Sequence, residues 1–182
     1  MFVRVDRARL WERADPTPLL IGPAVSAESA ARVAAWADGL VTVNQPPETL
    51  RKVIDAYRGA GGRGPVSLQL HLSWAPTDAQ ALRLAHDQWA ANVFGPPVPW
   101  DTATVEAFDT LASQVQPDAV RTPVRVSADL AEHRGWIEEY AELGFDDIYL
   151  HHVGQDQTAF IDAFGEHVLP GLTGAGLTGG AR

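Results

Sequence analysis

The sequence predicts an α/β protein in which parallel strands alternate with helices. Three features indicate this fold class: four short apolar runs, an amphipathic helical pattern after each of them, and breaker residues in between. A βαβαβαβα order of elements is compatible with two architectures. One is a doubly wound open sheet, and the other is half of an eight-stranded barrel, which needs a partner half to close.

The first crossover unit organises the chain. Residues 19–21 form a short apolar run, typical of a strand buried on both faces. Ser26 is a good N-cap for a helix over residues 27–37, and residues 40–43 begin the next buried strand. This βαβ pattern joins parallel strands, and it places a helix N-terminus, which favours anions, at the end of the first strand.

The later elements follow from periodicity and from capping residues. Residues 2–11 alternate as in a small hairpin, with its turn at residues 6–8. Strands are predicted at residues 66–74 and 147–153, with a brief extended piece at residues 124–129. The predicted helices are residues 48–58, 78–91, 104–114, 130–143 and 160–169. We expect one domain over residues 1–172 and a loose glycine-rich tail over residues 173–182.

Composition narrows the classes of function. The net charge is -9 with no basic block, which argues against nucleic acid and against an anionic membrane surface as partners. No segment approaches the roughly 20 apolar residues of a spanning helix, and the first residues lack the apolar core of a signal peptide. The absence of cysteine fits a reducing cytoplasm. No His/Cys cluster has ligand spacing, so no metal site is predicted.

Several short segments, taken together, resemble a known family. They are Pro18-Leu-Leu-Ile-Gly-Pro-Ala-Val-Ser, Ala37-Asp-Gly-Leu-Val-Thr and Leu143-Gly-Phe-Asp-Asp-Ile-Tyr-Leu. Their order and spacing are similar to the carboxyl-terminal half of luciferase-like flavin or deazaflavin oxidoreductases. His71-Leu-Ser-Trp-Ala-Pro, Asn92-Val-Phe-Gly-Pro-Pro and His151-His-Val-Gly-Gln resemble the branch that depends on coenzyme F420. The likeness runs from Val5 to Leu172.

The resemblance implies the carboxyl-terminal half of a (β/α)8 barrel, with a long helical insertion before the last strand. It also implies hydride transfer between coenzyme F420, or alternatively FMN, and a small organic substrate. The family's first four strands, which carry its usual catalytic His, Trp and Glu, have no counterpart here. We therefore expect a truncated or split protein, and catalysis by this half alone is in doubt. An amino-terminal half-barrel or a second copy is the expected partner, and a self-associating half-barrel without catalysis is the rival reading.

The resemblance also implies where the cofactor binds. Its tail is expected at the turn Val25-Ser26-Ala27 and at Thr42, Val43 and Asn44. Ser26 also reads simply as an N-cap, and Thr42 and Asn44 as strand-end caps. The family's sugar-phosphate branch has a substrate-binding lysine near Pro46, so that substrate is not supported here.

Three further residues are candidates for the substrate pocket. His71 and Ser73 alternate on one strand, so they share a face, and His71 could act as an acid or base. His151 and His152 are adjacent and must point to opposite faces, and His152 is the one predicted to line the pocket. The alternative for His71 is a buried, hydrogen-bonded histidine.

Overall fold

The computed structural model describes residues 4–9, 11–12 and 14–172. Its strands are β1 (Ile21–Pro23), β2 (Gly39–Val43), β3 (Val66–Trp74), β4 (Arg125–Ser127) and β5 (Asp147–His152). Its α-helices are α1 (Ala27–Val33), α2 (Pro47–Gly59), α3 (Asp78–Trp89), α4 (Val98–Asp101), α5 (Val105–Ala112), α6 (Leu130–Ala141), α7 (Thr158–His167) and α8 (Leu169–Leu172). Two 3-10 helices are η1 (Ala90–Val93) and η2 (Pro117–Arg121).

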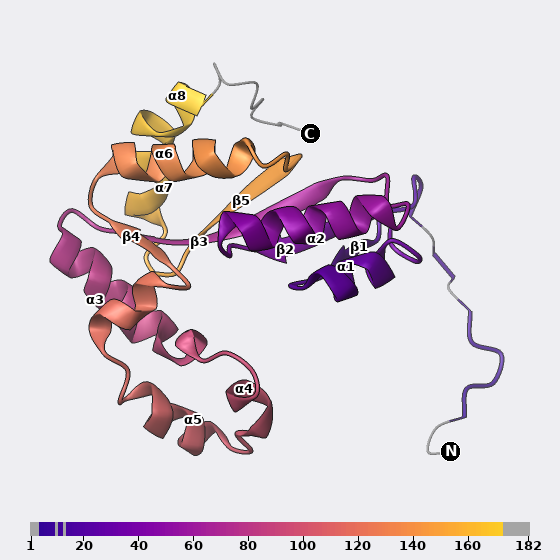
Figure 1. The fold of residues 1–182 in the computed structure, drawn as a ribbon, viewed down its shortest axis with the longest axis horizontal. Coiled ribbons are helices and arrows are strands. Elements are labelled where there is room, and N and C mark those ends of the chain that lie inside the picture. The colour runs from indigo at the N-terminus through magenta and orange to yellow at the C-terminus, as the bar shows by residue number, and fades with distance from the viewer. Residues whose placement is uncertain (1–3, 10, 13, 173–182) are drawn as a thin grey trace.

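All strand pairs in the described sheet are parallel, which confirms the predicted fold class (Figure 1). β2 pairs with β1 and β3, and β5 pairs with the other side of β3. The order β1-β2-β3-β5 advances in one direction without the reversal of a doubly wound sheet. Because right-handed crossovers in one direction keep helices on one face, this order is that of a half-barrel.

β4 is a strand that the sequence predicted only as a brief extended piece. β3 is long enough to have two neighbours along one edge: β2 pairs with its first half up to Val43↔Gln69, and β4 pairs with its end from Leu72↔Arg125 onward. β4 therefore continues the line of β2 beside the carboxyl-terminal end of β3.

The main core lies between the sheet and the helices of its convex face. Alternate residues of β3, namely Leu68, Leu70 and Leu72, are almost completely buried in it. Tyr57 of α2 and Phe164 of α7 belong to the same cluster. This alternation leaves the residues in between, Gln69 and His71, on the opposite, concave face.

The predicted insertion occupies residues 75–146, between β3 and β5. A second apolar cluster holds it to the end of β3, with Ala81 and Ala85 of α3 packed among Val120, Val124 and Val126. In Figure 1, α4 and α5 project away from the sheet. Within the described part of the chain, no helix is long and apolar enough to cross a bilayer.

Most predicted elements differ from the structure by one or two residues at their ends, and three predictions need a fuller correction. β1 begins at Ile21, and Leu19 and Leu20 are 65% and 55% exposed rather than buried, because they precede an edge strand. α1 ends at Val33 and continues only as a turn toward residue 37. The predicted amino-terminal hairpin is wrong for residues 4–9, which form no strand, and its other positions lie partly outside the described residues. The predicted tail at residues 173–182 lies outside them entirely.

Two aspartates make the same pair of contacts at the amino-terminal ends of the strands. The Asp38 N–H donates to the Leu20 carbonyl at 2.8 Å, and its carboxylate accepts from the Leu20 N–H at 2.9 Å. The Asp146 N–H donates to the Val66 carbonyl at 2.8 Å, and its carboxylate accepts from the Val66 N–H at 2.8 Å. Each aspartate therefore extends the ladder by one residue and fixes the register of two strands, β1 with β2 and β3 with β5.

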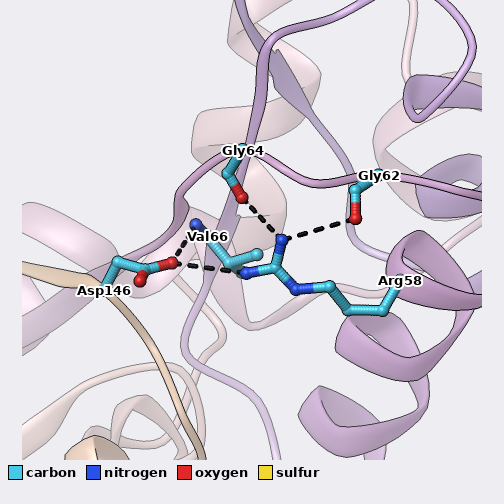
Figure 2. A network of polar contacts seen from close by, with 5 residues as sticks. All are labelled: Arg58, Gly62, Gly64, Val66 and Asp146. Atoms are coloured by element: carbon cyan, nitrogen blue, oxygen red, sulfur yellow. Dashed lines mark hydrogen bonds and ion pairs between the residues drawn. The ribbon is translucent and has the colours of Figure 1, made fainter.

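Arg58 connects the second of these aspartates to the loop before β3 (Figure 2). Its guanidinium donates to the Gly64 carbonyl at 2.7 Å and to the Gly62 carbonyl at 3.4 Å. The same group lies 3.4 Å from the Asp146 carboxylate. The end of α2, the α2–β3 loop and the start of β5 are thus held together at the end of the sheet opposite to the predicted site.

Candidate functional site

The candidate site lies on the concave face, toward the carboxyl ends of β3 and β5. His71 of β3 and His151 of β5 are direct partners in the parallel register. Their Nδ1 atoms are 2.8 Å apart, which is hydrogen-bond distance. His71, predicted from the sequence, is thus joined by a histidine that the prediction set aside.

Trp89, the last residue of α3, packs against both imidazole rings. The centroid of its ring lies 5.0 Å from that of His71 and 5.1 Å from that of His151. α3 reaches this position because its buried stripe, Ala81 and Ala85 followed by Trp89, repeats at helical spacing. The insertion therefore contributes an aromatic wall to the histidine pair.

Burial shapes the electrostatics of the pair. Burial, and the neighbouring His151 ring, lower the pKa of His71 from 6.5 to about 4. At neutral pH His71 is therefore an uncharged imidazole, which can donate through one nitrogen and accept through the other.

Ser73 is tied to the fold. It is fully buried, and its hydroxyl donates to the Ala81 carbonyl at 2.8 Å. This contact fixes the start of α3 over the end of β3. The hydroxyl hydrogen of Ser73 is therefore already donated within the protein and is not available to a substrate.

His152 lies on the helix side of the sheet. It stacks on Phe160 of α7 with ring centroids 4.8 Å apart, and its Nδ1 accepts from the Trp74 N–H at 3.5 Å. Burial lowers its pKa below the usual value. The structure thus places His151, not the predicted His152, beside His71. His152 shares a strand face with Ile148 and Leu150, which pack against the core. This alternation was the signal in the sequence that distinguishes the two histidines.

Two of the three predicted cofactor residues at the first turn, Val25 and Ser26, are exposed, and Ala27 is partly buried. Ser26 is the N-cap of α1: its hydroxyl oxygen accepts from the Ser29 N–H at 3.2 Å, and the hydroxyl donates to the Ser29 Oγ at 3.1 Å. Val25 is 59% exposed, and Ala27 begins the helix. α1 has only seven residues, so the anion preference of its N-terminus is modest.

Asn44 bridges the two strands that share one edge of β3. Its side-chain oxygen accepts from the His71 N–H at 3.0 Å, and its amide donates to the Pro123 carbonyl at 3.0 Å. It fills the gap between the end of β2 and the beginning of β4. Asn44 therefore holds the backbone of a site histidine in place.

Two other polar atoms at the end of β2 have no partner. Thr42 is 2% exposed, and its Oγ1 makes no hydrogen bond to any described residue. Gln45 Nε2, three residues on, is also buried and unpartnered within that part of the chain. In the parallel register Thr42 is the partner of Leu68, so its side chain lies on the helix face of the sheet, whereas Val43, the partner of Gln69, lies on the concave face. A buried polar group without a partner costs roughly 1–3 kcal/mol, and Gln45 Nε2, which lies beyond the end of the strand, is the one of these two atoms that is a candidate for a ligand contact.

Among residues 4–9, 11–12 and 14–172, no group of three or more His, Cys, Asp or Glu side chains is arranged to hold a metal ion. The candidate site is built from a histidine pair, an aromatic wall and the unpartnered amide of Gln45.

Comparison with known proteins identifies the family. A family model described as luciferase-like monooxygenase matches residues 1–147. The chain belongs to the luciferase-like monooxygenase family. This establishes the family that the sequence resembles, and it agrees with the half-barrel order of the strands.

Relatives of this luciferase-like chain are about twice its length. The F420-dependent glucose-6-phosphate dehydrogenase of Nakamurella multipartita is 30% identical over 181 residues, covering 94% of this chain and 53% of that protein. The protein of the same name from Beutenbergia cavernae is 27% identical over 176 residues, covering 91% and 52%. The chain thus spans about half the length of these relatives.

Solved structures support the same fold. An F420-dependent secondary alcohol dehydrogenase, solved in complex with an F420-acetone adduct, superposes with a TM-score of 0.73 at 22% identity, covering 91% of this chain and 52% of that one. The coenzyme F420 dependent tetrahydromethanopterin reductase from Methanopyrus kandleri gives a TM-score of 0.62 at 18% identity, covering 84% and 50%. At these identities the likeness concerns the fold alone.

Proposed function

We propose that this chain is the carboxyl-terminal half of a barrel oxidoreductase that uses coenzyme F420. The observation that carries the proposal is the similarity along 94% of the chain to a protein named as F420-dependent. When bound, the deazaflavin accepts or supplies a hydride. The chain's own contribution is one side of the barrel mouth, with Asn44 holding the backbone of His71 and Trp89 covering the histidine pair.

The cofactor tail would be held at the end of β2 and the facing β1–α1 turn. Gln45 supplies an amide donor that lacks a partner within the described chain, and this donor suits an oxygen atom of a phosphate or hydroxyl group. Thr42 faces the helix layer and would support this strand end from behind. Val25, Ser26, Ala27 and Val43 would add backbone and surface contacts. In contrast, the start of α2 is unsuited to an anion, because Pro46 and Pro47 lack N–H groups and Glu48 is acidic.

We propose an organic substrate without a phosphate group. Strand alternation places uncharged or acidic side chains on the concave face of β2, β3 and β5, including Gln69, Asp147 and Tyr149. The described strands put no lysine or arginine there. The sugar phosphate in the names of the relatives is therefore not carried over to this chain.

The test is a fluorescence titration of the purified chain with F420 and with FMN. Gln45→Leu should weaken F420 binding about fivefold, because it removes one hydrogen bond. It should leave the free energy of unfolding unchanged or raise it by up to about 1 kcal/mol, because it also removes an unpaired buried amide nitrogen.

Gln114→Leu is the matched control, since Gln114 is exposed just after α5, a helix that projects away from the sheet (Figure 1). This control should change neither the affinity for F420 nor the free energy of unfolding. Binding of FMN in preference to F420 would favour a flavin-dependent relative instead. No binding of either cofactor, even with an amino-terminal half supplied, would remove the proposal.

A second candidate is a half-barrel that associates without catalysis. β1 and β5 each pair on one side only within the described sheet, and Tyr149 on β5 is 58% exposed. We infer that a complementary half-barrel or a second copy adds strands to these edges. Size-exclusion chromatography with light scattering should then find a dimer or a complex with the amino-terminal half. A well-folded monomer with low dye binding would contradict this inference.

A further inference from the structure

We propose that His71 and His151 form a two-ring proton relay that binds the oxygen of an alcohol or carbonyl substrate and moves its proton. This inference rests on the proposed function and names the substrate class of the same site. In the parallel register the two histidines are direct neighbours on β3 and β5, and their Nδ1 atoms are 2.8 Å apart.

The hydrogen bond constrains the tautomers. One ring must carry a proton on Nδ1 and donate it, while the other must accept through a bare Nδ1. In a neutral pair, the donating ring then has a lone pair on Nε2 and the accepting ring has its proton on Nε2. The pair therefore presents one acceptor and one donor, which matches a hydroxyl group that gives a proton or a carbonyl group that receives one.

Both Nε2 atoms are open for such contacts. Neither makes a hydrogen bond to any residue among 4–9, 11–12 and 14–172, and neither is among the buried unpartnered atoms, as His133 Nδ1 is. His86, a partly buried histidine of the insertion, differs from the pair, because its Nε2 lies 2.9 Å from the Val115 carbonyl oxygen. The histidine pair thus combines a fixed internal hydrogen bond with two free outer nitrogens.

The surroundings keep the pair in this state. Trp89 packs against both rings and limits their rotation. Asn44 accepts from the backbone N–H of His71 and holds that strand end. The low pKa of His71, about 4, keeps it uncharged near neutral pH, so it can act as both donor and acceptor.

The proton and electron balance is complete. In alcohol oxidation the substrate C–H bond would break, and its hydride would leave with the electron pair to the deazaflavin that the proposed function names as the two-electron acceptor. The hydroxyl proton goes to the bare Nε2 of one ring. That ring passes its Nδ1 proton to the Nδ1 of the other ring, whose Nε2 proton is released to water. Carbonyl reduction is the reverse, and each turnover exchanges the tautomers of the two rings.

The test is nuclear magnetic resonance of the full chain with ¹⁵N-labelled histidine, using 2-propanol and acetone as probes. We expect one proton resonance coupled to the Nδ1 atoms of both rings. It should be lost in His151→Phe, which keeps an aromatic ring against Trp89, and in His71→Asn. Both probes should shift the Nε2 signals of His71 and His151, and either variant should weaken this response roughly tenfold.

His167→Asn is the control, because the His167 side chain is 54% exposed on α7, and it should leave these signals unchanged. Separate Nδ1 protons on the two rings, or Nε2 signals that neither probe shifts, would overturn the relay. If F420 still binds in that case, the proposed function stands without the relay. If the shared proton and the probe response are found but F420 does not bind, the relay is supported and the F420 assignment fails.

Discussion

Replacing Gly64 by alanine is expected to destabilise the chain by at least about 3 kcal/mol. A Cβ atom at this position would lie 1.5 Å from the Asp38 carbonyl oxygen and 2.7 Å from its carbon. Both are backbone atoms of the segment that leads into β2, so no side-chain rotation relieves the overlap. The α2–β3 loop would have to move, which would also disturb the hydrogen bond from Arg58 to the Gly64 carbonyl.

Urea unfolding of Gly64→Ala, followed by circular dichroism, measures this effect. Gly59→Ala is the matched control, because a Cβ there meets nothing within 4 Å. Gly59 ends the 13-residue helix α2, so alanine should leave stability unchanged or raise it by up to about 1 kcal/mol. Equal stability of the two variants would contradict the close approach of the loop to Asp38.

Replacing Asp146 by alanine is expected to lower the free energy of unfolding by about 2 kcal/mol. The change removes the acceptor of the Val66 N–H, which lies 2.8 Å from the carboxylate, and the contact with Arg58 at 3.4 Å. Val66 is fully buried, so its N–H is poorly placed to recover a partner from water. The two effects act on the start of β3, the central strand of the sheet.

The adjacent aspartate provides the control. Asp147 is exposed, and Asp147→Ala should change stability by less than about 0.5 kcal/mol. Asp146→Asn should fall in between, because the amide oxygen still accepts from Val66 while the ion pair with Arg58 is lost. Similar unfolding midpoints for Asp146→Ala and Asp147→Ala would show that the contacts in Figure 2 contribute nothing to stability.

These two changes also separate stability from function. Gly64 and Asp146 lie at the amino-terminal ends of the strands, whereas the histidine pair lies toward the carboxyl ends of β3 and β5. Under native conditions, folded Asp146→Ala should therefore bind F420 as the unchanged chain does. In parallel-strand barrels the carboxyl end carries function, and the other end serves stability.

Much of the fold could be predicted from local patterns. The bounds of β3 were predicted as observed, because nine residues that alternate between apolar and polar lie between a glycine-rich turn and a capped helix. The face shared by Leu68, Leu70 and Leu72 follows from strand alternation, and so does the opposite placement of His71. The predicted start of β1 was wrong because this strand lies at the edge of the sheet, where Leu19 and Leu20 are exposed. Apolar character alone does not show whether a neighbouring element covers a residue.

The sequence by itself determined that parallel strands alternate with helices, and that His71 and Ser73 project from one face of their strand. Both are consequences of the period of the side chains along one strand or one helix. Only the tertiary structure decided that His151 is the partner of His71, that Ser73 and Asn44 serve the backbone, and that Trp89 closes over the pair. These contacts join segments far apart in the chain, so they depend on strand register and on the path of the insertion, which no local periodicity encodes.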